Sequence, residues 1–180
     1  MTIAHLRPLS VNDAPEVYSA FQSNADMMRQ GSIQSLEDAR DYVANLIHPE
    51  SHHRPWAIAN GSLLIGLVCV SIDEQNKNGW FWYWMTEGAR GQGIMSRAAA
   101  TIANVALDEW GLDRLELGHR VNNPASGYVA RAAGFIKEGT ERAKFLVDGE
   151  RIDVDTYGRL KSDPIPRIEQ LRMEGADSTA

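Results

Sequence analysis

The chain has 180 residues with a net charge of −6, and 43% of them are hydrophobic. This composition predicts one folded domain with its own core and argues against a nucleic-acid-binding surface, which would need a basic face. The N-terminus lacks a signal-peptide pattern, no apolar run is long enough to cross a membrane, and the single cysteine, Cys69, cannot form an internal disulfide. We therefore expect a cytoplasmic protein.

The first half of the chain predicts one strand, two helices and a hairpin. A short strand is expected over residues 3–9, and Ser10 with Asp13 marks the start of a helix whose apolar face runs to Phe21. The weak periodicity of residues 22–34 indicates a loop. The remaining elements are a helix over 36–47 capped by Ser35, a strand over 56–59, a type I′ turn at Asn60–Gly61 and a buried strand over 63–72.

The second half alternates strands and helices and ends in a hairpin. Its expected elements are an aromatic strand over 80–86, a helix ending at Gly111, a strand over 115–120, a helix from Asn123 or Ser126 to Gly134, a strand from Phe135, a turn at Asp148–Gly149 and a strand over 152–160. The tail, residues 161–180, is expected to be loose, with a short helix at 167–173. This order predicts an α+β fold on a mixed, mostly antiparallel sheet.

The loop between the aromatic strand and the next helix carries the strongest functional signal. It reads TEGARGQGIMS over residues 86–96. Gly91 and Gly93 let the backbone approach an anion closely, and the free N–H groups of the first helical turn point at it. Arg90 adds a positive charge. The pattern predicts a pyrophosphate held at this turn.

Three other readings of this loop stay open. A P-loop would need Gly-Lys-Ser/Thr at its end, whereas Gly93 is followed by Ile94 and Met95. A dinucleotide-binding fold would need G-x-G-x-x-G, and the order of Gly88, Gly91 and Gly93 differs from it. The third reading is a structural turn, in which the glycines serve only to reverse the chain.

The loop resembles the Q/R-x-x-G-x-G/A motif of the GNAT N-acetyltransferase superfamily, with Arg90 and Gly93 matching and Met95 departing from the small last residue. Further segments resemble its RimJ/RimL-like branch: Tyr83-Trp84, residues 120–126, Gly134-Phe135, Glu138-Gly139, and Asp153 with Tyr157. The resemblance covers residues 1–160. It implies a single acetyltransferase domain with a twisted sheet of about seven strands and about four helices, splayed between strands 4 and 5.

The resemblance also implies the donor and the residues that hold it. Acetyl-CoA would be the cosubstrate, with no metal. Its pyrophosphate would lie on the backbone of residues 91–96 beside Arg90; these residues are Gly91, Gln92, Gly93, Ile94, Met95 and Ser96. Backbone groups of Trp84, Met85 and Thr86 would pair with the pantetheine arm, and an N–H near Met85 would hold the thioester oxygen. Asn123 would contact the pantetheine, cap the helix, or do both.

The catalytic residues match the family less completely. Ser126 lies at the position that resembles the proton donor to the leaving thiolate. The tyrosine that many GNAT enzymes use for this purpose is replaced by Ala130, and Tyr128 is out of register. The carboxylate base of the last hairpin is also absent, because Lys144 or Phe145 stands there. Three candidates remain for a base: Glu87, Glu141 and His119.

A site without a strong base favours a weakly basic acceptor. An α-amine with a pKa near 8 is roughly one-tenth neutral at pH 7, whereas a lysine amine is below about one in a thousand. We therefore expect acetylation of a protein N-terminus. A small-molecule amine, an antibiotic and a non-catalytic acyl-CoA-binding regulator stay open, as does a homodimer. Trp82, where this branch usually has glycine, would reshape the acceptor pocket or pack in the core.

Overall fold

The computed structural model describes residues 4–24, 26–27 and 30–175, and all structural statements below concern these residues. They form seven strands, β1 His5–Pro8, β2 His53–Asn60, β3 Leu63–Asp73, β4 Asn78–Met85, β5 Arg114–Arg120, β6 Ile136–Val147 and β7 Glu150–Leu160. The helices are α1 Ala14–Ser23, α2 Leu36–Ile47, α3 Ile94–Asp108 and α4 Pro124–Ala132, with short 3₁₀ turns η1 Val11–Asp13 and η3 Glu87–Ala89. The expected α+β fold is confirmed. None of the described helices is long and apolar enough to span a membrane.

The seven strands form one sheet in the order β1-β2-β3-β4-β5-β7-β6. All neighbours are antiparallel except β4 and β5, which are parallel and pair only from Asn78↔Arg114 to Trp80↔Glu116. Beyond this last pair the two strands separate, although β4 continues to Met85 and β5 to Arg120. The splay between strands 4 and 5 is therefore confirmed, and it leaves an opening in the middle of the sheet.

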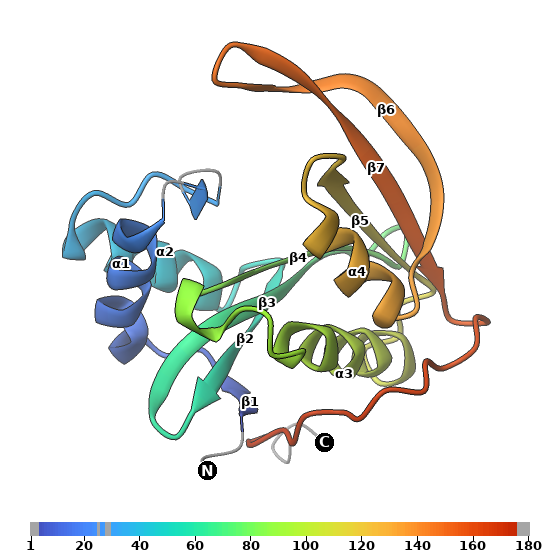
Figure 1. Ribbon diagram of the computed structural model, residues 1–180. Helices are drawn as coiled ribbons and strands as arrows, with labels where there is room; N and C mark the ends of the chain where they lie inside the picture. The colour runs from blue at the N-terminus through green and yellow to red at the C-terminus, as the bar shows by residue number, and fades with distance from the viewer. Residues whose placement is uncertain (1–3, 25, 28–29, 176–180) are drawn as a thin grey trace.

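Two pairs of helices cover the two faces of the sheet (Figure 1). Because side chains alternate along a strand, β4 contributes to both cores. Phe81 and Met85 pack with α3, whereas Trp84 packs with α1 and α2. The face that carries α3 and α4 is thus distinct from the face that carries α1 and α2, and the opening connects them.

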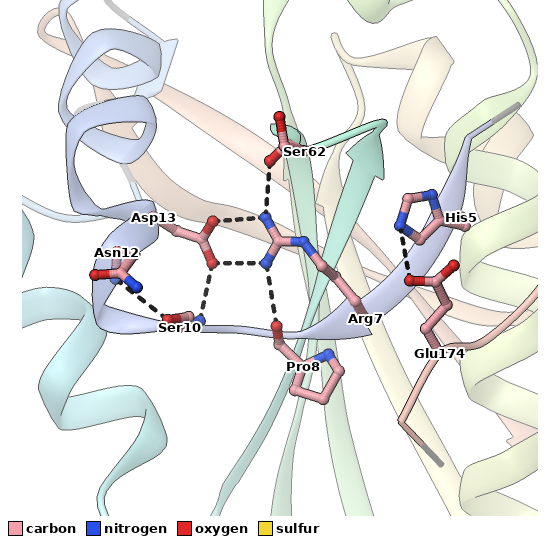
Figure 2. Close-up of polar contacts among 8 residues, drawn as sticks. All are labelled: His5, Arg7, Pro8, Ser10, Asn12, Asp13, Ser62 and Glu174. Atoms are coloured by element: carbon pink, nitrogen blue, oxygen red, sulfur yellow. Dashed lines mark hydrogen bonds and ion pairs between the residues drawn. The ribbon is translucent and has the colours of Figure 1, made fainter. Parts of the chain in front are cut away.

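The first strand and the first helix are joined by a partly buried ion pair (Figure 2). Ser10 and Asp13 form the expected capping box, in which Asp13 Oδ2 accepts the backbone N–H of Ser10 at 2.8 Å. The Arg7 guanidinium donates to both carboxylate oxygens of Asp13, at 2.9 and 2.6 Å, and to Ser62 O at 3.3 Å. Asp13 raises the pKa of Arg7 through this hydrogen bonding. These contacts fix β1 against η1 and the β2–β3 turn.

One hairpin turn differs from the expectation. Asn60 pairs with Leu63, so the two loop residues are Gly61 and Ser62, and only Gly61 has positive φ. The turn is therefore not type I′, which needs positive φ at both central residues. At the β6–β7 turn both loop residues, Asp148 and Gly149, have positive φ, which fits type I′.

The C-terminal segment also differs, since residues 164–175 pack against the domain and contain no helix. Leu171 is buried, and its N–H donates to Thr101 Oγ1 on α3 at 2.9 Å. Further along, Leu6 and Met173 form a parallel bridge, and His5 pairs with Glu174 at 3.5 Å. The segment runs beneath α3 back to β1 (Figure 1) and is an extended strap where a helix was expected.

Candidate functional site

The glycine-rich loop leads into the N-terminus of α3. The first helical hydrogen bond runs from Arg97 N to Gly93 O at 3.2 Å, so the N–H groups of Ile94, Met95 and Ser96 precede the helical ladder. Among the described residues, no side chain caps this end. Three N–H groups and the positive end of the helix dipole are therefore available to bind an anion.

Gly91 and Gly93 are required by the backbone rather than by packing. Their φ values are +75° and +72°, a region that other residues enter only with strain. A Cβ built on either residue meets no atom within 4 Å. The space beside the helix N-terminus is therefore open, which fits a group the size of a pyrophosphate.

The backbone of β4 decides which groups face the opening in the sheet. Thr86 N donates to Ile65 O on β3 at 2.9 Å, and alternate residues of an antiparallel ladder bond to the same neighbour. With the register Gly66↔Met85, the backbone groups of Trp84 therefore also point to β3. Those of Met85 and Tyr83 point toward β5. The expectation that Trp84, Met85 and Thr86 pair with pantetheine stays a prediction, and of these three Met85 is the residue whose backbone groups point toward the opening.

Arg90 lies beside the mouth of the opening. Its Nε donates to Met85 O at 3.2 Å, which places an exposed guanidinium between the end of β4 and the start of α3. Gln92 Nε2 donates to Gly88 O at 3.3 Å and stabilises the loop from within. Arg90 and Gln92 thus connect the loop to the end of β4 and to η3, just before the start of α3.

A tyrosine and a serine meet across the opening. Tyr83, on β4, places its hydroxyl 2.7 Å from Ser126 Oγ and 3.2 Å from Ser126 O on α4. If Tyr83 donates to the Ser126 carbonyl, the Ser126 hydroxyl donates to Tyr83. Burial raises the pKa of Tyr83 to about 12, so the phenol stays protonated at neutral pH. The pair forms a hydrogen-bonded relay at the place where the strands separate.

Asn123 and His119 have different surroundings. Asn123 Oδ1 caps α4 by accepting Ser126 N–H at 3.2 Å, so the capping role is present. His119 is buried beneath α4, where its Nδ1 lies 2.8 Å from Arg120 O and its Nε2 has no hydrogen-bond partner among the described residues. A Cβ on Gly127 would lie 2.9 Å from that Nε2. The structure therefore places His119 against α4 at Gly127, the residue after Ser126, and its role as a base stays a prediction.

The two carboxylate candidates for the base are surface groups. Glu87 is exposed on η3, and Glu141 is exposed on β6, where it forms an ion pair with Lys144. Neither lies beside the Tyr83–Ser126 pair among the contacts of the described residues. The assignment of either carboxylate as the base stays a prediction.

Two hollows lie near the opening. One, of about 710 Å³, lies between α2, the start of β2 and Trp82, and its lining includes Tyr42, His52 and His53. The Trp82 indole N–H donates to Ser71 Oγ at 3.0 Å, and His53 Nδ1 lies 2.8 Å from the same oxygen. Trp82 therefore packs against the core formed with α1 and α2, which is one of the two alternatives from the sequence, and it also lines this hollow. Its effect on an acceptor pocket stays a prediction.

The second hollow, of about 230 Å³, lies on the same face of β4 but toward β5, between Trp80 and the β6–β7 hairpin. Neither Trp80 nor the role of Tyr83 was identified as part of the site from the sequence. Tyr83 belongs to the Tyr83-Trp84 pair that carried the family resemblance, and this was the available signal. No such signal was present for Trp80, because the residues around it belong to β5 and β7, which are distant in the chain.

Known proteins resemble the chain in sequence and in structure. Residues 4–136 match the acetyltransferase (GNAT) domain family. The chain is 30% identical over 164 residues to the ribosomal-protein-serine acetyltransferase of Escherichia coli, covering 86% of this chain and 91% of that protein. It is 29% identical over 171 residues to the probable N-acetyltransferase YjcK of Bacillus subtilis, covering 88% and 94%. The structure of RimL, the ribosomal L7/L12 alpha-N-protein acetyltransferase in complex with coenzyme A, aligns with a TM-score of 0.80 at 26% identity, covering 89% of this chain and 95% of RimL.

Proposed function

Since the chain belongs to the GNAT acetyltransferase family, we propose that it transfers the acetyl group of acetyl-CoA to the α-amine of a protein N-terminus. The observation that carries the proposal is the opening between β4 and β5, which lies next to the uncapped N-terminus of α3. A narrow acyl thioester fits an opening in a sheet, and its diphosphate fits the helix end.

The described residues fit the donor at three points. The N–H groups of Ile94, Met95 and Ser96 face the open space that the pyrophosphate needs. Arg90 supplies positive charge beside them. The Met85 N–H points into the opening, where it can donate to the thioester oxygen as negative charge develops on it.

The proton balance of the transfer points to Ser126 and Tyr83. The neutral amine nitrogen bonds to the thioester carbonyl carbon, the carbon–sulfur bond breaks, and the sulfur takes a proton. The amine nitrogen gives up one proton to solvent as the amide forms, which balances the proton that the sulfur takes. Ser126 Oγ is the proposed donor to the sulfur, the Tyr83 hydroxyl at 2.7 Å passes its own proton to Ser126, and Tyr83 regains a proton from solvent. A thiol with a pKa of about 8.5 leaves readily, so the relay should speed the reaction rather than decide whether it occurs.

The choice of acceptor follows from the relay itself, to which no carboxylate is hydrogen-bonded among the described residues. A site that cannot remove a proton from lysine works best with an amine that is already partly neutral at pH 7, and an α-amine meets that requirement. The E. coli relative, a ribosomal-protein-serine acetyltransferase, supports an N-terminal serine as the first candidate.

The test uses two short peptides with acetyl-CoA and follows release of the coenzyme A thiol. One peptide begins with a free serine and contains no lysine, and the other is blocked at its N-terminus and contains one lysine. We expect turnover with the first and at least tenfold slower turnover with the second. Faster reaction of the blocked peptide would exclude the proposed acceptor, and turnover with neither would favour a small-molecule amine or a non-catalytic acyl-CoA-binding protein.

A further inference from the structure

Trp80 is the exposed tryptophan of β4. Trp82 and Trp84 pack on the second core, whereas the Trp80 side chain, on the same face of the strand, is 44% exposed. Trp80 also forms, with Glu116, the last pair before β4 and β5 separate. Its indole therefore lies at the closed end of the opening, on the face opposite α3.

A glycine on β5 leaves room for this indole to approach the neighbouring strand. Gly118 lies inside β5 without a positive φ, so its backbone could accept any residue. A Cβ built there would lie 3.2 Å from Trp80 Cη2 and 3.3 Å from Val154 Cγ1. A glycine inside a strand weakens it, and such a glycine often marks a close approach. Here the approaching group is the ring of Trp80.

Carboxylates surround the exposed side of the ring. Trp80 shares the 230 Å³ hollow with Glu116, Glu138 and Glu141. Arg114 bonds Glu116 at 2.9 Å and Glu138 at 2.9 and 2.5 Å, and Lys144 pairs with Glu141. Three carboxylates thus face two cations, which leaves one excess negative charge at the rim. A hydrophobic platform with an acidic rim suits a cation that keeps part of its hydration.

We propose that the indole of Trp80, held over Gly118, is the platform on which the α-ammonium group of the acceptor binds before it loses its proton. The inference rests on the proposed function and adds the specificity-determining contact for the acceptor. Roughly nine-tenths of α-amines are charged at pH 7, so the acceptor arrives mainly as a cation. The platform adjoins the opening, where the amine must reach the thioester carbonyl.

A permanent cation tests the platform without any turnover. The probe is a tetrapeptide that begins with serine and carries an N,N,N-trimethyl group, compared with the same peptide bearing a neutral N-acetyl group. Calorimetry in saturating coenzyme A should show the trimethyl peptide binding about tenfold more tightly to the wild type. Trp80→Leu should weaken binding of the trimethyl peptide by about tenfold, whereas Trp80→Phe, which keeps a ring, should weaken its binding by less than about threefold.

A matched pair of glycine variants tests the placement of the ring. Gly118→Ala places a methyl group against Trp80 and should weaken binding of the trimethyl peptide. Gly139→Ala, whose Cβ meets only Thr156 Oγ1 at 3.6 Å, should leave that binding unchanged. The melting temperature and the affinity for coenzyme A should change in none of the Trp80 variants. Equal binding of the trimethyl and acetyl peptides, or unchanged binding in Trp80→Leu, would overturn the platform. The proposed function fails separately, if the platform binds the cation but no α-amine is acetylated.

Discussion

A charge at the N-terminus of α3 gives the sharpest test of the donor site. Gly93→Asp places a carboxylate at a residue with φ +72° and open space around its Cβ. Gly111, after the other end of the same helix, is a matched control, because its φ is +73° and a Cβ there also meets no atom within 4 Å. Both variants should lose about 1 kcal/mol of stability to the left-handed backbone.

The effect on binding separates the two variants. The repulsion between a carboxylate and a phosphate oxygen about 4 Å away is about 1 kcal/mol in water and about 4 kcal/mol at an effective dielectric constant of 20. We therefore expect Gly93→Asp to weaken acetyl-CoA binding by about 100-fold, which is about 2.7 kcal/mol, and Gly111→Asp to leave it within about twofold.

The assay is calorimetric titration with acetyl-CoA. Gly93→Ala separates charge from strain, because it keeps the backbone cost without the carboxylate and should weaken binding by less than about tenfold. Equal loss of affinity in Gly93→Asp and Gly111→Asp would refute the reasoning, since it would mean that general destabilisation, and not the phosphate site, controls binding.

Three further predictions follow from single contacts. Tyr83→Phe removes the hydroxyl that contacts Ser126, so kcat should fall about tenfold with little change in acetyl-CoA affinity, and adding Ser126→Ala should lower it little further. Burial lowers the pKa of His119, so the unfolded state binds a proton first as the pH falls below about 6.5 and the folded state is then destabilised. Thermal unfolding should show a drop in melting temperature from pH 7 to pH 5 for the wild type that is smaller for His119→Gln. Asp13→Asn breaks the pair with Arg7 and should cost about 3 kcal/mol in urea unfolding.

Each of these predictions has a control. Tyr18→Phe removes the hydroxyl of a half-buried tyrosine on α1 and should leave kcat unchanged. If the wild type and His119→Gln lose the same stability between pH 7 and pH 5, a group other than His119 causes the loss at low pH. Arg7→Met combined with Asp13→Asn should recover part of the loss, because no buried charge remains unpaired. If the stability losses of Arg7→Met and Asp13→Asn simply add in the double variant, the two side chains do not interact directly.

Local chemistry made most of the fold predictable. The capping box of Ser35 and Asp38 and the apolar spacing after it predicted α2 with its observed bounds. The glycines of the loop and the apolar spacing after them predicted a tight turn followed by a helix, because these features depend on neighbouring residues. The type I′ prediction at Asn60–Gly61 was wrong, since the pairing of Asn60 with Leu63, and not the dipeptide, decides which residues form the turn.

Contacts between distant segments were not predictable from patterns. Tyr83 and Ser126 are 43 residues apart and meet only because β4 and β5 separate. The direction of the Thr86 N–H depends on the register with β3, and the exposure of Trp80 depends on a glycine in another strand. The docking of Leu171 on Thr101 likewise required the path of the whole tail.

The most direct test of the central claim is the position of the acetyl group in a peptide that offers both amines. The peptide begins with a free serine, carries one internal lysine, and is incubated with the protein and acetyl-CoA at pH 7. Fragment mass spectra should place the acetyl group on the α-amine alone. An acetyl group on the lysine side chain, or an unmodified peptide in the presence of bound acetyl-CoA, would contradict the account.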